Sequence, residues 1–230
     1  MCGIFGIISK NDVNPLPLAH IAQSNVERGN LGFGGVTYGW QNQLEIFRFT
    51  EPFNIGLIPL PRARAVLAHT RAPTGAQSDR IEEIHPFESQ DVLLAHNGLI
   101  LNHEAFPDWR INPGISVDSQ IIAGGIQAGI NRGQDIVASI KHTVERLEGQ
   151  QACWLVDKRS SHVYIWRVMS PVYVAMLDGA TMAFSSSRTL SGGRLLREGV
   201  IYRIDLHRID SEEVTTFAYK NPYGNSQHSL

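Results

Sequence analysis

Apolar residues along the chain follow two different spacings, and the change between them divides the chain into three stretches. In the first stretch, short apolar runs bounded by turn residues predict β-strands, and one run at helical spacing predicts a helix over 15–27. This helix has Pro17 near its start and Gly29 just after its end, where both residue types are common. The expected strands are 4–9, 36–40, 44–49, 65–69 and 91–96.

The middle stretch has the spacing of amphipathic helices, expected over 118–131 and 135–147. The last stretch returns to strands, with the hairpin signal Asp178-Gly179 between two of them. These strands are expected over 151–157, 162–168, 172–177, 181–186, 199–205 and 213–218. The order predicts one layered α+β domain over 1–230 with antiparallel sheets and a polar C-terminal tail from about 219. Helices between two sheets would bury apolar faces on both sides.

Two segments interrupt the regular pattern. Residues 29–35 are rich in glycine and are expected to form a hinge. The segment 70–90 is long and polar, and a loop of this length in a compact domain is usually functional.

Composition excludes several classes of function. With 230 residues, 43% of them hydrophobic, and a net charge of −2, the chain is expected to fold as a soluble protein without a surface for nucleic acid. No apolar run reaches the length of a membrane span, and no secretory signal is present. The two cysteines, Cys2 and Cys153, are too few for a disulfide framework or a structural zinc site, so a reducing cytoplasm is expected. Cys153 lies in an apolar run and is expected to be inert core.

The N-terminus carries the first candidate for chemistry. The small residue at position 2 allows removal of Met1, which would leave Cys2 with a free α-amino group beside its thiol. The α-amino pKa is about 7.7–8.0 and the thiol pKa about 8.5, so the amine can accept the thiol proton near neutral pH. The alternative is a core strand that happens to contain a buried cysteine.

Three further segments carry candidate chemistry. Arg71 follows an expected strand and could hold a carboxylate, or it could be a surface arginine in a turn. Asn97 and Gly98, at the end of another expected strand, could direct two N–H groups at one oxygen as an oxyanion hole, or could form a turn. Asp118 could anchor a cationic amine, or it could be an early helical acid near an N-cap at Ser116.

These segments belong to a longer series of motifs in a fixed order. The series is Met1-Cys2-Gly3-Ile4-Phe5-Gly6-Ile7, Arg28-Gly29, His69-Thr70-Arg71, His85-Pro86, His96-Asn97-Gly98 followed by Asn102-His103-Glu104, and Val117-Asp118-Ser119. With this series, from residue 2 to about 190, the chain resembles the glutaminase domain of class II glutamine amidotransferases, the N-terminal-nucleophile (Ntn) kind. It looks most like that domain of glucosamine-6-phosphate synthase. The resemblance implies an Ntn-hydrolase-type four-layer sandwich, with antiparallel sheets packed between helices.

The resemblance also implies a role for each matched residue. Cys2 would attack the side-chain amide of L-glutamine, and Asn97 and Gly98 would hold the oxyanion, with Gly98 also contacting the substrate. Arg71 would bind the α-carboxylate and Asp118 the α-ammonium group, which positions the amide against the thiol. A γ-glutamyl thioester would release ammonia and then be hydrolysed to glutamate. No cofactor and no metal are implied.

The chain departs from the family's pattern in two places. Residues 30–32 lack the acidic residue and serine that usually follow the Arg-Gly pair, so this loop could close differently. Ala72 and Gly75 stand where the glucosamine enzyme has a tryptophan and a histidine that couple glutamine binding to a synthase domain. Because no phosphosugar or nucleotide-binding domain follows, we expect a separate ammonia-accepting synthase subunit, and a free-standing glutaminase is the alternative. A homo-oligomer remains open.

Two other functions remain open at this point. One is an Ntn amidase that cleaves a different amide, whose relatives lack the pair formed by Arg71 and Asp118. The other is a non-catalytic structural or interaction protein on a retired glutaminase fold, which a persistent Met1 would favour because it blocks the amine of Cys2. The joint presence of nucleophile, oxyanion donors and both substrate clamps favours the glutaminase.

Overall fold

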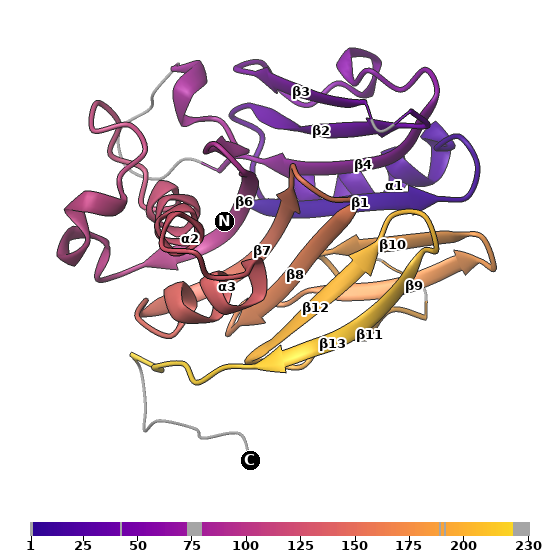
Figure 1. Cartoon of the computed structure of the whole chain (residues 1–230). Coiled ribbons are helices and arrows are strands. Elements are labelled where there is room, and N and C mark those ends of the chain that lie inside the picture. Colours follow the sequence, from indigo (N-terminus) through magenta and orange to yellow (C-terminus); the bar gives the residue numbers. More distant parts are fainter. Residues whose placement is uncertain (1, 42, 73–79, 189, 191, 223–230) are drawn as a thin grey trace.

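The computed structural model of the chain describes residues 2–41, 43–72, 80–188, 190 and 192–222. The strands within these ranges form two antiparallel sheets, of seven and six strands (Figure 1). The α+β class and the antiparallel pairing expected from the sequence are therefore confirmed.

The seven-stranded sheet has the order β11-β9-β10-β1-β4-β2-β3. Its strands are β1 (Gly3–Ser9), β2 (Phe33–Gly39), β3 (Leu44–Phe49), β4 (Ala63–Thr70), β9 (Tyr173–Asp178), β10 (Thr181–Ser185) and β11 (Arg194–Leu195). The N-terminal strand β1 lies in the interior of the sheet, between β10 and β4, and its first residue Gly3 pairs with Thr70. Cys2 therefore leaves the sheet beside the end of β4.

The six-stranded sheet has the order β13-β12-β8-β7-β6-β5. Its strands are β5 (Phe87–Glu88), β6 (Val92–Ile100), β7 (Gly149–Asp157), β8 (His162–Val168), β12 (Val200–Asp205) and β13 (Asp210–Thr216). β6 pairs with β7 over its whole length, from Val92 opposite Asp157 to Ile100 opposite Gly149.

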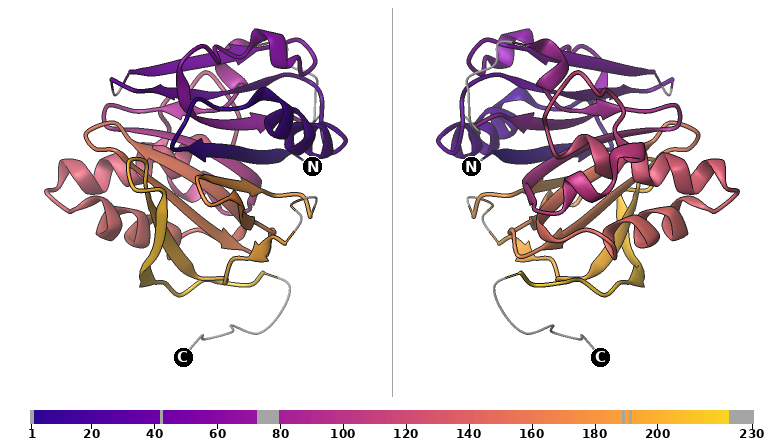
Figure 2. Two further views of the ribbon diagram at one scale, coloured as in Figure 1. Left: turned by 90° about the vertical axis from the view of Figure 1, so that its right-hand side faces the viewer. Right: turned by 90° about the vertical axis from the view of Figure 1, so that its left-hand side faces the viewer.

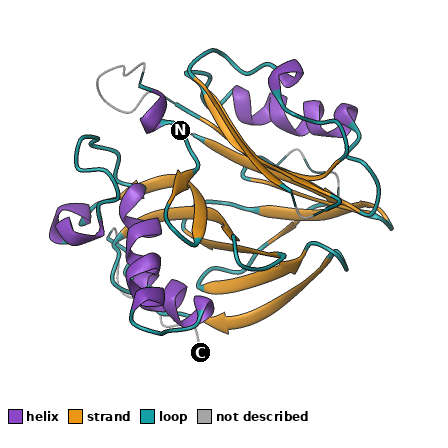
Figure 3. Cartoon of the chain, turned by 45° about the horizontal axis from the view of Figure 1, so that its top comes forward, coloured by secondary structure: helices purple, strands orange, loops and turns teal. Residues whose placement is uncertain are grey.

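The helices cover the outer faces of the two sheets. The α-helices are α1 (Pro15–Val26), α2 (Gln120–Asn131) and α3 (Ile136–Val144), and the single-turn 3₁₀-helices are η1 (Ile55–Leu57), η2 (Ile81–Glu83), η3 (His103–Ala105) and η4 (Pro107–Trp109). Figure 2 shows α2 and α3 on one side of the molecule and α1 on the opposite side. The strands lie between these two helical layers (Figure 3).

Three apolar clusters hold the layers together. Side chains alternate along β1, so Ile4 packs with Trp154 between the two sheets, while Phe5 packs with Leu18 of α1 on the outer face. A third cluster, which includes Ile122 of α2, fills the space between the six-stranded sheet and its helices. The four-layer sandwich is confirmed. The expectation that helices lie between two sheets is wrong, because apolar side chains of both sheets pack directly against each other.

The glycine-rich hinge expected over 29–35 is wrong in its second half, because β2 begins at Phe33. Gly34 lies inside this strand, and a Cβ there would be 2.2 Å from the carbonyl oxygen of His85. Its glycine therefore permits a close approach of two chain segments rather than a bend.

Other local expectations hold. Asp178-Gly179 joins β9 to β10 as a hairpin, and Cys153 is fully buried in β7. The polar tail expected from about 219 stays a prediction: Tyr219 at its start donates a hydrogen bond to Glu198, and residues 223–230 lie outside the described residues. No helix in the described ranges is long and apolar enough to span a membrane.

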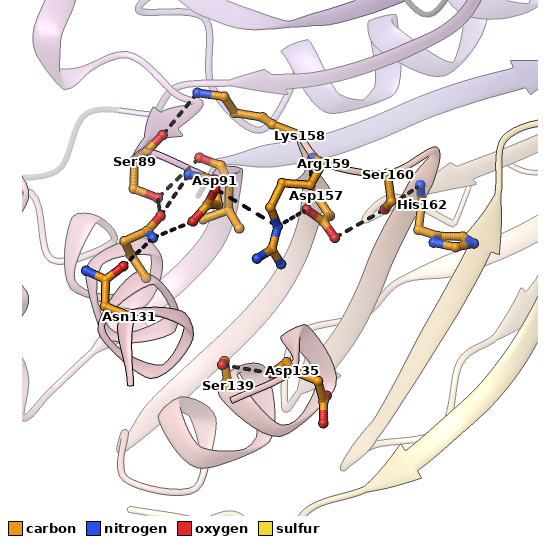
Figure 4. A network of polar contacts seen from close by, with 12 residues as sticks. Ser89, Asp91, Asn131, Asp135, Ser139, Asp157, Lys158, Arg159, Ser160 and His162 are labelled. Carbon is orange, nitrogen blue, oxygen red and sulfur yellow. Dashed lines mark hydrogen bonds and ion pairs between the residues drawn. The ribbon is translucent and has the colours of Figure 1, made fainter. Parts of the chain in front are cut away.

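The C-terminal end of α2 is fixed to the start of β6 by polar contacts. Gln127 donates through Nε2 to a carboxylate oxygen of Asp91 at 2.7 Å, and its Oε1 accepts from the hydroxyl of Ser89 at 2.9 Å. Figure 4 shows Ser89, Asp91 and Asn131 gathered at this end of the helix. These contacts hold α2 in register with β6, which carries two of the candidate site residues.

Candidate active site

Cys2 is held at both its side chain and its main chain. The backbone N–H of Ala72 donates a hydrogen bond to the sulfur at 3.3 Å. Arg28 donates through Nε to the carbonyl oxygen of Cys2 at 3.1 Å. The residue is half-buried, so its thiol has a fixed position and is still partly accessible.

Burial raises the pKa of the Cys2 thiol above the ordinary value, because the thiolate would lose its hydration. The N–H group of Ala72 and the charge of Arg71 lower this pKa, and the charge of Asp118 raises it. The charges of Arg71 and Asp118 therefore both act on the sulfur. The sequence separates these residues widely, and the fold brings them to one place.

A buried polar network holds the beginning of β1, next to Cys2. Asn25 of α1 donates through Nδ2 to the hydroxyl of Ser185 at 2.9 Å and accepts at Oδ1 from the hydroxyl of Ser186 at 2.9 Å. The Ser186 hydroxyl in turn accepts from the backbone N–H of Ile4 at 3.0 Å. A Cβ on Gly3 would lie 2.6 Å from Cβ of Asn25, so only glycine fits there. No motif or spacing in the sequence indicates a role for Asn25.

Asn97 and Gly98 lie inside β6, and the expectation that they end a strand is wrong. The strand continues to Ile100 because β7 pairs with every residue of it. Asn97 is 2% exposed, and its Nδ2 has no hydrogen-bond partner in the part of the chain that the structure describes. A buried N–H donor without a partner is costly and is unusual away from a functional site. A Cβ on Gly98 would lie 2.0 Å from the carbonyl oxygen of Gln150.

Asp118 precedes α2 rather than lying in its first turn. The helix begins at Gln120 with Ser119 at the N-cap, so the expected helical acid and the expected N-cap at Ser116 are both wrong. Asp118 instead accepts a hydrogen bond at Oδ2 from the backbone N–H of Ile100 at 2.6 Å. Its carboxylate is thereby tied to β6, two residues beyond Gly98.

Arg71 lies directly after β4 and is buried, which is not expected of a surface arginine in a turn. Its Nη2 forms an ion pair with Oε2 of Glu83 at 2.7 Å, and both side chains are 9% exposed. Glu83 belongs to η2 and was missed in the sequence, where nothing connects it with Arg71. Gly75, the other departure noted after Arg71, lies outside the described residues.

Three histidines lie buried beside these residues. The ring centroids of His69 and His85 are 3.9 Å apart, and Nδ1 of His96 lies 2.8 Å from the hydroxyl oxygen of Ser119. Burial, reinforced by the neighbouring His96 and by the charge of Arg71, lowers the pKa of His69 to about 3. Burial also lowers the pKa of His85 and of His96. All three are therefore neutral at physiological pH.

The motif series contained these histidines without assigning them a role. Their burial could not be seen in the sequence, because His69 and His96 belong to different sheets. Among the described residues, no group of three or more histidine, cysteine, aspartate and glutamate side chains could hold a metal ion.

Curated sequences similar to the chain carry the name glutamine–fructose-6-phosphate aminotransferase (isomerizing). The protein of Halalkalibacterium halodurans is 23% identical over 202 residues, which cover 83% of this chain and 33% of the relative. That of Shewanella oneidensis is 26% identical over 200 residues, covering 83% and 32%. The chain thus spans about a third of the length of the curated relatives it matches. No protein-family profile matches it.

Solved structures share the fold. Glutamine phosphoribosylpyrophosphate amidotransferase from Bacillus subtilis superposes with a TM-score of 0.70 at 21% identity, covering 94% of this chain and 50% of that one. A glutamine aminotransferase class-II domain protein from Silicibacter pomeroyi superposes with a TM-score of 0.60 at 17% identity, covering 94% and 99%. Both comparisons confirm the resemblance drawn from the motifs, and the fold is that of the Ntn class II glutamine amidotransferases.

Proposed function

We propose that the chain is a glutaminase unit of the class II glutamine amidotransferase type, which hydrolyses L-glutamine to glutamate and ammonia. The observation that carries this proposal is the meeting of opposite charges at one thiol: the N–H of Ala72, the residue after Arg71, contacts the sulfur of Cys2 at 3.3 Å, and the charges of Arg71 and Asp118 both act on that sulfur. A free amino acid has one carboxylate and one ammonium group, and this pair of charges matches them. The names of the similar proteins point to the same substrate.

Cys2 is the proposed nucleophile. After removal of Met1, which lies outside the described residues, the α-amino group accepts the thiol proton as the sulfur attacks the side-chain amide carbon of glutamine. The C–N bond breaks, the amide nitrogen takes up the proton and leaves as ammonia, and a γ-glutamyl thioester remains on Cys2. Water then attacks the thioester, which restores the thiol and yields glutamate. The raised pKa of Cys2 supports a thiol activated by a base during attack rather than a resting thiolate.

Asn97 and Gly98 are the proposed oxyanion donors. The side-chain N–H of Asn97 and the backbone N–H of Gly98 would stabilise the oxygen of each tetrahedral intermediate. The support is the buried Nδ2 of Asn97, which has no hydrogen-bond partner among the described residues and could donate to a ligand oxygen. Gly98 would also contact the bound substrate.

Arg71 and Asp118 are the proposed clamps for the α-carboxylate and the α-ammonium group. Together they would set the length and direction of the bound amino acid and bring its amide to the sulfur. A primary amide without these charged groups would be held less firmly, which is how the site would discriminate against other amides.

We also propose that the ammonia passes to a synthase, as a separate subunit or another domain, and that the protein works in the cytoplasm. Ammonia in bulk water at neutral pH is largely protonated and so lost as a nucleophile. A named relative supports a coupled acceptor, since its name joins glutamine to fructose 6-phosphate. A reducing compartment would keep Cys2 a thiol.

Intact-mass analysis with a glutamine-analogue electrophile, 6-diazo-5-oxo-L-norleucine, tests the assignment together with an assay of glutamate release. We expect loss of Met1, one adduct per chain and glutamate release. Cys2→Ala should lose the adduct and the activity, whereas the matched control Cys153→Ala should keep both, because Cys153 is buried in the core. An adduct that persists in Cys2→Ala, or a processed chain that releases no glutamate, would refute the proposal.

A further inference from the structure

The proposed α-carboxylate clamp already has a carboxylate on it. Glu83 contacts Nη2 of Arg71 at 2.7 Å, and both side chains are 9% exposed. In every other ion pair of the described residues, at least one side chain is more exposed than these two. A buried pair of this kind costs desolvation of both charges and contributes little net stability, so its retention calls for another explanation.

We propose that Glu83 is a specificity-determining residue that competes with the substrate's α-carboxylate for Arg71. The inference rests on the proposed function, because it assigns Arg71 to that carboxylate. If glutamine bound with the ion pair intact, two carboxylates would share one buried guanidinium, and one negative charge would have no counterion. Like charges placed together in this way strongly disfavour binding. Tight binding of an α-carboxylate therefore requires that the ion pair between Glu83 and Arg71 breaks.

The position of Glu83 suits this role. It lies on the single-turn helix η2, whose N-terminus has no side-chain cap, and the neighbouring Ile81 and Glu82 are exposed while Glu83 is buried. Arg80, directly before η2, donates through Nη1 to the carbonyl oxygen of Gly114 at 2.7 Å. Gly114 lies in the segment that leads to Asp118. The segment with the competing carboxylate is thus linked to the segment with the second proposed clamp.

The competition predicts that the preference for glutamine over an amide that lacks the α-carboxylate is weaker than it would be without Glu83. 4-Aminobutanamide is such a probe, because it is glutamine with the α-carboxylate replaced by hydrogen. In the unaltered protein, kcat/KM should favour glutamine over 4-aminobutanamide by a smaller factor than in Glu83→Gln, because displacing Glu83 offsets part of the gain from the Arg71 contact.

Glu83→Gln is the decisive variant, since it keeps the size of the side chain and removes its charge. We expect KM for glutamine to fall by about tenfold or more, with kcat unchanged and KM for 4-aminobutanamide unchanged. The matched control is Glu82→Gln, the exposed neighbour that pairs with Arg80, and it should leave both KM values as they are. A rise in KM for glutamine in Glu83→Gln would overturn the inference and make Glu83 a residue that positions Arg71.

Thermal unfolding of each variant separates a loss of fold from a change of specificity. If Glu83→Gln does not fold, Glu83→Asp serves instead, because its shorter side chain keeps the charge but should compete less and also lower KM for glutamine. An unchanged or raised KM in that variant would again overturn the inference.

Failure of the inference can be distinguished from failure of the proposed function. Glutamate release by the unaltered protein without a fall in KM in Glu83→Gln or Glu83→Asp would overturn the competition alone. No glutamate release by any variant, together with no adduct of 6-diazo-5-oxo-L-norleucine on Cys2, would overturn both.

Discussion

The backbone N–H of Ala72 points at the thiol of Cys2 across 3.3 Å. Ala72 directly follows Arg71, so the segment that carries the buried guanidinium also contacts the proposed nucleophile. Any shift of this segment when a carboxylate binds would change the hydrogen bond to the sulfur. Substrate recognition and the reactivity of the thiol are thereby joined through two adjacent residues.

The reactivity of Cys2 should depend on pH in a defined way. Because burial raises the thiol pKa, the thiolate fraction near pH 7.5 is smaller than in an ordinary cysteine. Alkylation of Cys2 by iodoacetamide, followed by mass spectrometry, should therefore be slower than that of free cysteine and keep rising beyond the pH where free cysteine levels off. Cys153 should remain unmodified in the same samples. A plateau reached below pH 8 would contradict the raised pKa.

Asn97→Ala should act on the transition state. Loss of one oxyanion donor typically lowers kcat by about 10²–10³-fold, and KM should change little because the donor is needed mainly as negative charge develops. Stability should hardly fall, since Nδ2 has no protein partner in the described residues to lose. Steady-state kinetics and urea unfolding measure both effects. Asn102→Ala is the control and should leave kcat unchanged. A change in KM alone in Asn97→Ala would make Asn97 a substrate-binding residue instead of an oxyanion donor.

Removal of either proposed clamp should raise KM for glutamine. Arg71→Ala should cost about 2–5 kcal/mol in substrate binding, and it should also destabilise the fold by about 3–5 kcal/mol because Glu83 is left buried without a counterion. Arg71→Met combined with Glu83→Leu removes both charges and should restore stability but not binding.

Asp118→Asn provides the matching test for the ammonium group. The amide oxygen can still accept the hydrogen bond from the N–H of Ile100, so KM should rise while the fold survives. Unchanged KM in Asp118→Asn and in the Arg71 and Glu83 double variant, with folding verified by urea unfolding, would refute the clamp assignment.

The buried histidines should make stability dependent on pH in the acid range. His69 has a folded pKa of about 3 against an ordinary value of 6.5, so the unfolded chain binds its proton first as pH falls. The contribution of neutral His69 to the free energy of unfolding is fully present above pH 6.5. It is lost as pH decreases toward 3, by about 1.4 kcal/mol per pH unit.

Urea unfolding at pH 7.5, 6.0 and 5.0 measures this dependence. His69→Phe, which cannot be protonated, should weaken it. An equal pH dependence in the unaltered protein and in His69→Phe would contradict the low pKa.

The order of strands and helices could be predicted because it depends on local periodicity. The predicted strand 44–49 coincides with β3, and the predicted helix 15–27 differs from α1 by one residue. The predicted strand boundaries were wrong where a neighbouring strand extends the pairing. β6 runs through Asn97 and Gly98 because β7 offers hydrogen bonds there, and β2 starts at Phe33 because glycines let neighbouring segments approach.

By itself the sequence determined the fold class, the candidate nucleophile Cys2 and the candidate residues Arg71, Asn97 and Asp118, because short motifs and local spacing carry that information. Only the tertiary structure decided what surrounds them. The contact of Arg71 with Glu83 depends on the place of η2 beside the end of β4, and the buried Nδ2 of Asn97, without a partner among the described residues, depends on the packing of one sheet upon another. Such contacts join residues that have no regular spacing in the sequence, so no local pattern predicts them.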